Sequence, residues 1–129
     1  LVNSLLMLIE ERAEDGVIRY YTEGDAYGLA QQATKEVKEE TGLDVLAKKI
    51  IAIQDRNKHN KPAYAYGVCK IFVLCEVVGG KFEKNIETTE IAYFSLDELP
   101  ELSEAKNNKE QIEMCFKANQ DKDWEVQFD

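Results

Sequence analysis

Histidine, proline and long apolar runs are all scarce in this chain of 129 residues, which has one histidine and two prolines. The apolar run Ile71–Cys75 is far shorter than the roughly 20 residues that a membrane helix needs. The three cysteines show no C-x-x-C spacing, which argues against a disulfide framework and against a zinc site. We therefore expect a protein that does not span a membrane and that resides in the reducing cytoplasm.

Positive charge is also in short supply, because 16 Lys and Arg residues face 25 Asp and Glu residues, for a formal net charge of −9. Such a surface repels polyanions, and no basic patch compensates for it, so we expect no nucleic-acid partner. An anionic small ligand would need a metal ion. The 44% hydrophobic content is that of an ordinary globular protein, and the length predicts a single domain over residues 1–129.

The N-terminal segment 1–9 is apolar but has neither a basic leader nor a small-residue cleavage site. It is therefore predicted to be a strand and not a signal peptide. The chain does not begin with Met, so we expect residues upstream of Leu1.

Periodicity and turn residues predict the order β-β-α-β-β-β-α. An Asp15-Gly16 turn joins the first two strands, and Gly42 ends the first helix in a left-handed conformation. We expect an α/β fold, with a central mixed sheet covered by a helix on each face. The predicted strands cover 3–10, 17–22, 45–53, 64–78 and 91–96, and the first helix runs from about Gly28 to Gly42.

The segment 64–78 is predicted to be the central strand, because apolar side chains fall on both of its faces. Cys69, Ile71, Val73 and Cys75 face one way, and Phe72 and Leu74 face the other. The polar, basic segment 55–61 is predicted to be a loop. The final helix is predicted to begin near Asn107, with Asn107 and Glu110 as a capping box and with Ile112, Cys115 and Phe116 as its buried stripe.

Three acidic residues, Glu36, Glu39 and Glu40, stand at i, i+3 and i+4 of the first helix, so their carboxylates share one face. Like charges at these spacings repel by roughly 0.2–0.5 kcal/mol per pair. A divalent cation would offset the repulsion, and Mg²⁺, with Mn²⁺ as an alternative, suits carboxylate oxygens. The alternative is a solvated acidic face that Lys35 and Lys38 screen.

The segment Lys35–Leu43 closely resembles the helical half of the Nudix box, G-x5-E-x7-R-E-U-x-E-E-x-G-U, in which U is aliphatic. Tyr93–Pro100 is similar to the aromatic strand and D-E-L ending of that family. The resemblance implies an α/β/α sandwich and a Mg²⁺-dependent hydrolase that cleaves the pyrophosphate bond of a nucleoside diphosphate linked to another moiety. Segments 52–59 and 72–80 look similar to the ADP-ribose and CDP-choline pyrophosphatases of the family.

The front half of the box departs from this pattern. Lys35 stands at the Arg position, which keeps the charge but loses the planar fork of a guanidinium. Tyr27 stands where the first Glu belongs, and Tyr21 where the first Gly belongs. Two explanations compete: this region has diverged, or residues of a longer mobile loop between Tyr21 and Gly28 are missing from the sequence. The segment 20–25 looks like the two ends of such a loop without its glycines, which favours the second explanation. Divergence would indicate a catalytically impaired module with a nucleotide-binding or regulatory function.

The resemblance assigns Glu36, Glu39 and Glu40 as metal ligands, with Lys35 orienting the carboxylates. Glu39 and Glu40 are the expected catalytic residues of the helix. A general base must activate water, and we expect Glu90 in this role before Glu87. An acidic interaction domain without metal is a further alternative.

Substrate contacts are predicted in and after the basic segment. Arg56 could pair with a phosphate, His59 with a phosphate or ribose, and Tyr66 could stack on a nucleobase together with Tyr64. Each residue also has an ordinary alternative. Arg56 could balance the acidic surface charge, His59 could be a solvated loop residue, and the tyrosines could pack on the sheet. The expected partner is a small nucleotide substrate, and the resemblance to ADP-ribose enzymes predicts a homodimer.

Overall fold

The computed structural model describes residues 4–13, 23–86 and 88–129. Its elements follow one another as β1 (Ser4–Ala13), α1 (Glu23–Thr41), β2 (Leu43–Asp55), α2 (Arg56–His59), β3 (Gly67–Gly80), the 3-10 helix η1 (Leu96–Glu98), α3 (Lys109–Gln120) and β4 (Gln127–Phe128). No helix in these ranges is both long and apolar enough to cross a membrane.

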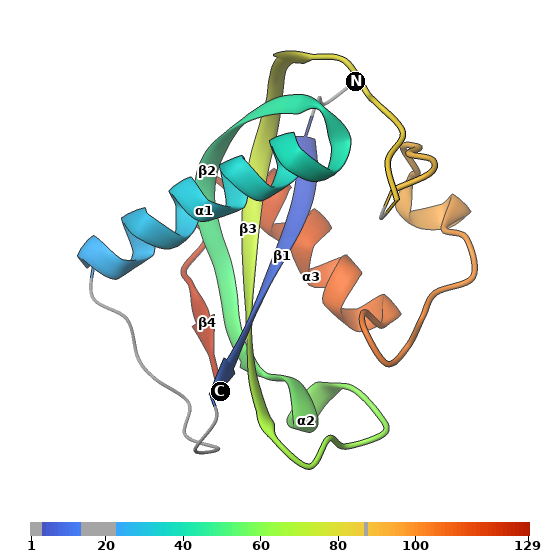
Figure 1. Cartoon of the computed structure of the whole chain (residues 1–129). Coiled ribbons are helices and arrows are strands. Elements are labelled where there is room, and N and C mark those ends of the chain that lie inside the picture. The colour runs from blue at the N-terminus through green and yellow to red at the C-terminus, as the bar shows by residue number, and fades with distance from the viewer. Residues whose placement is uncertain (1–3, 14–22, 87) are drawn as a thin grey trace.

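The described strands form one mixed sheet in the order β1-β3-β2-β4. The central strand β3 runs antiparallel to both β1 and β2, whereas β4 runs parallel to β2. Helix α1 crosses one face of this sheet and α3 lies on the other (Figure 1). The predicted α/β architecture is therefore confirmed.

The two faces of β3 carry side chains as the alternation predicts. Ile71 and Val73 lie in a buried cluster with Ala33 and Val37 of α1. Phe72 lies in a second cluster with residues of β2 and α3, and Leu74 packs against that cluster. Burial on both faces is what makes β3 the centre of the sheet.

Helix α1 ends where the sequence predicts, because Gly42 adopts φ = +79°. That conformation strains residues with a Cβ, and a Cβ at Gly42 would also collide with the backbone carbonyl of Lys81. The hydroxyl of Thr41 donates to the Val37 carbonyl oxygen at 2.7 Å and accepts from the Leu43 N–H at 3.2 Å. The chain therefore passes from α1 into β2 through a tightly bonded joint.

Helix α3 begins one residue later than predicted, because Asn108 is its N-cap. The capping box joins Asn108 to Gln111, with each side chain bonded to the backbone N–H of the other residue. The buried stripe is Gln111, Cys115 and Ala118, whereas Ile112 and Phe116 are half-buried, so the predicted stripe is only partly correct.

Two further predictions are wrong. The segment 91–96 forms no strand with the described residues: Ile91 packs against the α1-side cluster, but Tyr93 and Phe94 are exposed. The segment 55–61 is not wholly a loop, because Asp55 caps the short helix α2 by accepting from the Asn57 N–H at 3.0 Å. The predicted turn at Asp15-Gly16 and the strand over 17–22 lie outside the described residues.

Candidate functional site

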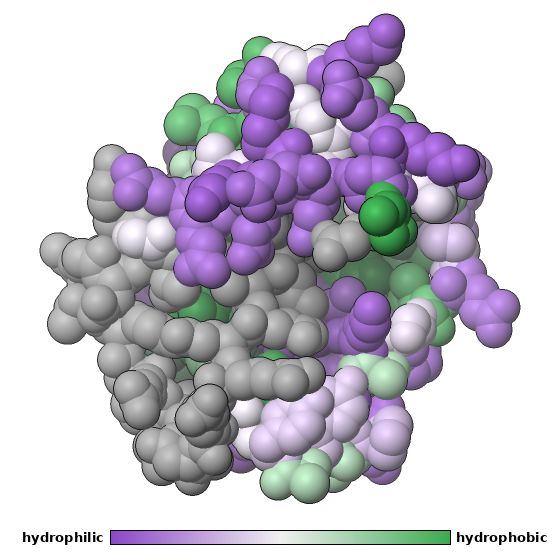
Figure 2. Space-filling view, viewed as in Figure 1, coloured by the Kyte–Doolittle hydropathy of each residue, from purple (hydrophilic) through white to green (hydrophobic). Residues whose placement is uncertain are grey.

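The acidic face of α1 points into solvent. Glu39 and Glu40 are exposed, and Glu36 is half-buried. Figure 2 shows a hydrophilic band along α1 on this side of the molecule. The helix is anchored on its opposite side by Ala33 and Val37, which are buried against the sheet. Local helical geometry thus presents the three carboxylates on a rigid element with free access from outside.

Each of these glutamates already interacts with a neighbour. Glu36 Oε1 accepts from Gln32 Nε2 at 3.2 Å, and Lys35 Nζ lies 3.9 Å from Glu39 Oε1. The Lys35–Glu39 pair is largely exposed, and exposed pairs contribute at most about 1 kcal/mol. A ligand that holds the carboxylates more strongly could displace these contacts.

The donor chemistry of this face fits a divalent cation, since carboxylate oxygens are the ligands that Mg²⁺ prefers. Among the described residues, however, no three His, Cys, Asp or Glu side chains are gathered so that they could hold a metal ion. The three carboxylates therefore supply suitable ligands without forming a closed cage, and a metal would have to draw them together.

The segment after β3 runs beside the C-terminal end of α1. The Glu83 N–H donates to the Thr41 carbonyl oxygen at 3.0 Å, and Asn85 Nδ2 donates to the Glu40 carbonyl oxygen. Because Ile91 packs against the cluster beneath α1, both ends of the segment are fixed. Glu90 is an exposed residue of this segment, while Glu87 lies outside the described residues.

Arg56 does not lie on an exposed basic loop, as the sequence suggested, because its side chain is fully buried. Its guanidinium donates to the carbonyl oxygens of Pro62 and, at 2.8 Å, of Ala105. The Tyr64 ring lies against it, with its centroid 3.5 Å from Arg56 Cζ. The two terminal nitrogens of the guanidinium are thus bonded within the protein, and Nε is buried without a hydrogen-bond partner among the described residues. Because the whole side chain is inaccessible, Arg56 is not part of the proposed site.

Tyr66 precedes β3 and lies on no regular strand, contrary to the prediction. It is 39% exposed and packs on Tyr64, with ring centroids 5.3 Å apart. His59 ends α2, where its Nε2 contacts Asp129 Oδ2. His59 belongs to α2, and Tyr66 packs on Tyr64, which contacts Arg56 of α2. Helix α2 lies at one end of β2, and the C-terminal end of α1 lies at the other (Figure 1). The structure therefore does not bring Tyr66 and His59 together with the glutamates of α1.

The three cysteines form no disulfide and are buried, as expected of small core residues. Burial raises the pKa of the Cys75 thiol to about 11. It raises the pKa of Cys115 to about 12, against the opposing positive charge of Lys70. A raised pKa keeps both thiols protonated and unreactive at neutral pH, so they are no nucleophiles.

Comparison with known proteins places this arrangement in a family. The crystal structure of an ADP-ribose pyrophosphatase from Streptococcus suis 89-1591 superposes with a TM-score of 0.70 at 42% identity, covering 78% of this chain and 72% of that one. The chain belongs to the Nudix family. The helical half of the box predicted this family, and the similarity to ADP-ribose pyrophosphatase-like members agrees with the resemblance of segments 52–59 and 72–80.

Two further relatives agree with this Nudix assignment. "Putative ADP-ribose pyrophosphatase YjhB" of Bacillus subtilis (strain 168) is 37% identical over 100 residues, which are 78% of this chain and 48% of the relative. The chain thus spans about half the length of that curated relative. The crystal structure of a UDP-X diphosphatase matches with a TM-score of 0.63 at 29% identity, over 76% of this chain and 47% of that one. No family model matches the chain.

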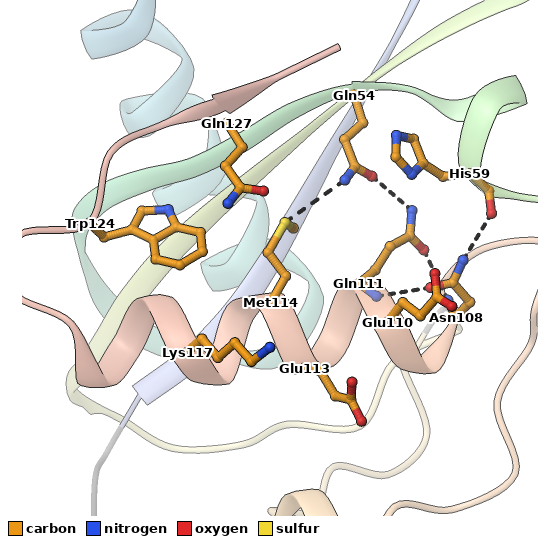
Figure 3. A pocket seen from close by; sticks show the side chains of 10 residues that line it. All are labelled: Gln54, His59, Asn108, Glu110, Gln111, Glu113, Met114, Lys117, Trp124 and Gln127. Atoms are coloured by element: carbon orange, nitrogen blue, oxygen red, sulfur yellow. Dashed lines mark hydrogen bonds between the residues drawn. The ribbon is translucent and has the colours of Figure 1, made fainter.

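The sequence prediction anticipated one feature of this Nudix domain only in part. A pocket on the α3 side of the sheet is lined by residues of β2, α2, α3 and β4 (Figure 3). Its lining residues are distant in sequence, and no motif connects them. His59, a predicted substrate contact, is among them, and Trp124, the single tryptophan of the chain, was a further signal in the sequence.

Proposed function

We propose that this chain is a divalent-cation-dependent hydrolase that cleaves the pyrophosphate bond of a nucleoside diphosphate linked to a sugar, of the ADP-ribose type. The observation that carries the proposal is the face of α1 on which Glu36, Glu39 and Glu40 stand, directly before the stop at Gly42. The names of the relatives support an ADP-ribose-type substrate. A CDP-choline-type compound is the second choice, from the resemblance of segments 52–59 and 72–80.

Glu36, Glu39 and Glu40 are the residues that would hold the cation, with Mg²⁺ expected first and Mn²⁺ as the alternative. When bound, such an ion neutralises phosphate charge and lowers the pKa of a coordinated water. Lys35, whose Nζ lies 3.9 Å from Glu39 Oε1, would help to orient that carboxylate.

Glu90 is the proposed general base. It would accept a proton from the attacking water as the oxygen–phosphorus bond forms, while the bond from that phosphorus to the bridging oxygen breaks. The products would be a nucleoside monophosphate and a sugar phosphate. Anchoring of its segment to α1, through Glu83 and Asn85, supports this assignment.

The direct test is hydrolysis of a substrate panel, followed by release of phosphate from the products by a coupled phosphatase. The panel contains ADP-ribose, CDP-choline, NADH, diadenosine polyphosphates and nucleoside triphosphates, each with Mg²⁺ and then with Mn²⁺. We expect ADP-ribose to turn over fastest, and only with a divalent cation. Equal rates in excess EDTA would contradict the metal dependence.

Glu39→Gln tests the residue assignment, because the amide keeps the shape of the side chain and removes its charge. We expect turnover to fall by about 100-fold or more, within the range for loss of a catalytic acid–base or metal-binding group. Glu125→Gln makes the same exchange at an exposed residue outside the site and should leave the rate unchanged. Unchanged turnover in Glu39→Gln would refute the mechanism.

A non-catalytic nucleotide-binding module is the second candidate function. It is favoured by the absence, among the described residues, of a gathered set of metal-ligating side chains. Isothermal titration calorimetry with ADP-ribose distinguishes the two, since binding without turnover under every metal condition would support the module.

We also propose that the protein is a single-domain homodimer of the cytoplasm. The three buried cysteines, none of them in a disulfide, support a reducing compartment. Sedimentation equilibrium tests the assembly, because a homodimer gives twice the mass of the 14.7 kDa chain. A single species at the chain mass would refute the dimer.

A further inference from the structure

The pocket on the α3 side has a volume of about 380 Å³. An engineered cavity of roughly 150 Å³ holds benzene, so this one has room for a larger ring system. It lies between α3 and the adjoining ends of β2 and β4, on the opposite face of the sheet from α1 (Figures 1 and 3). The acidic face of α1 therefore does not contribute to it.

A chain of amide hydrogen bonds fixes the orientation of the polar groups at this pocket. Gln111 Oε1 accepts from the Asn108 N–H at 2.9 Å and from Asn60 Nδ2 at 2.9 Å. Its Nε2 must then be the donor, and it donates to Asn60 Oδ1 at 2.8 Å and to Gln54 Oε1 at 3.0 Å. The first donor is a backbone N–H, which can only donate. The orientation of every side-chain amide in the series is therefore determined.

This series of hydrogen bonds leaves the amide nitrogen of Gln54 directed at the pocket, where its partner is a poor acceptor. Gln54 is 8% exposed, and the one contact of its Nε2 among the described residues is Met114 Sδ, at 3.8 Å. A thioether is a weak acceptor, whereas a buried amide donor without a good acceptor costs about 1–3 kcal/mol. An acceptor atom supplied by a ligand would satisfy it.

Two apolar side chains, Trp124 and Met114, lie beside this donor in a lining that is otherwise polar. Trp124 is held by its Nε1, which donates to the Ile51 carbonyl oxygen at 2.9 Å, and its ring packs at the edge of the α3-side cluster. Figure 3 shows Met114 between the Trp124 ring and Gln54, with the Gln127 amide directed toward the same space. A planar ligand could thus lie on Trp124 and Met114 with its edge toward the amides.

The charges at the mouth of the pocket disfavour an anion. Glu110 and Glu113 line it and Asp129 adjoins it at His59, against one lysine, Lys117. The formal net charge of the chain is also −9. A phosphate group on the ligand would therefore be repelled.

We propose that this pocket binds an uncharged nitrogen heterocycle of nucleobase or nucleoside size. The ring lies against Trp124 and Met114, and a ring nitrogen or carbonyl oxygen accepts from Gln54 Nε2. Base edges carry such acceptors, and their planes stack well on aromatic side chains. This site is separate from the proposed hydrolytic site and needs no metal.

Fluorescence of Trp124 tests the proposal directly, because it is the single tryptophan of the chain. Adenosine, guanosine, cytidine and uridine are titrated into the full chain in EDTA, so that failure of the hydrolase proposal does not affect the result. We expect a saturable change with at least one nucleoside, and at least threefold weaker binding of its 5′-monophosphate. No saturable change with any of the four would overturn the proposal.

Gln54→Glu tests the donor, because a carboxylate keeps the oxygen that faces Gln111 and removes the N–H groups. We expect nucleoside affinity to fall about tenfold, as for one lost hydrogen bond. Gln120→Glu, an exposed residue of α3 outside this pocket, should leave affinity unchanged. Undiminished binding by Gln54→Glu would overturn the assignment of the donor.

Gln127→Ala is a second variant, which avoids placing a charge in the interior. The Gln127 side chain is exposed on β4, so its truncation should leave folding intact. We expect nucleoside affinity to fall two- to fivefold. Weakened binding here, with hydrolysis by α1 unaltered, would separate the two sites, whereas equal losses in affinity and turnover would contradict their separation.

Discussion

The two faces of the sheet are held together by different interactions. The cluster beneath α1 is built from apolar side chains and two cysteines. The α3 side has a smaller apolar cluster. Beside it lie all five of the buried polar residues found in the described part of the chain, Gln54, Arg56, Asn60, Lys70 and Gln111.

Those five residues form one connected network. Asn60 stands at its centre, since its side chain or backbone accepts from Arg56, Lys70 and Gln111. Apolar contacts tolerate exchanges of similar volume, whereas buried hydrogen bonds require each partner at its own place. The difference predicts that the α3 side is the more sensitive to conservative substitution, and that it is the better place for a specific polar ligand.

The largest effect on stability is expected for Gln111→Leu. Leucine fills a similar volume but leaves the Asn108 N–H and the Gln54 side-chain oxygen without these partners. It also removes two of the hydrogen bonds of the Asn60 amide. We expect the free energy of unfolding to fall by about 3 kcal/mol in urea denaturation. Gln120→Leu, at the exposed end of the same helix, should change it by less than about 0.5 kcal/mol. Equal effects of the two variants would remove the contrast between the faces.

Gly42→Ala is expected to be next, at about 2 kcal/mol. The positive φ disfavours alanine, and its Cβ would meet the Lys81 carbonyl. Gly28→Ala is the matched control, because Gly28 lies in α1 with open space around its Cα. Alanine there should raise the unfolding free energy by about 0.5–1 kcal/mol. Thermal unfolding of both variants checks the opposite signs.

Ile71→Val probes the apolar face and should cost about 1 kcal/mol. Ile71 is fully buried in the cluster beneath α1, and loss of one methylene leaves a small void there. A cost as large as that of Gln111→Leu, measured by the same urea denaturation, would mean that the apolar face is packed as strictly as the polar one.

A final expected effect is a pH dependence of stability from one thiol on each face. The pKa of Cys75 is raised to about 11 and that of Cys115 to about 12, from an ordinary value of 9.0. Unfolded chains therefore release these protons first, so the stabilisation is complete below pH 9 and is lost as pH rises towards 11 and 12. We expect the unfolding temperature to fall over this window, less steeply in a Cys75→Ala, Cys115→Ala variant.

Local patterns in the sequence were enough to predict much of the fold. The alternation in β3 assigned Ile71 and Phe72 to opposite faces, and Gly42 marked the end of α1, because both signals depend on near neighbours. The glutamate face of α1 follows from helical periodicity for the same reason. The Nudix resemblance rested on that helix and is confirmed at the level of the family.

What the sequence did not predict depends on distant partners. Arg56 looked like a surface cation because its neighbours are polar, yet the carbonyl of Ala105 lies close enough to hold it inside. The N-cap is Asn108 and not Asn107, since Gln111 is needed in the network. The segment 91–96 has strand-forming residues but no partner strand among those described. Whether the carboxylates gather on a metal is likewise not encoded locally.

The pairing of β3 also has a consequence for the order of folding. Asp55 pairs with Cys69, so β2 and β3 can meet by closing a short loop. Ser4 pairs with Glu76, so β1 must find β3 across most of the intervening chain, including α1. Closing the longer loop costs more entropy and is slower. We therefore expect β2 and β3 to form the folding nucleus, and β1 to add last, so that substitutions in β1 chiefly speed unfolding.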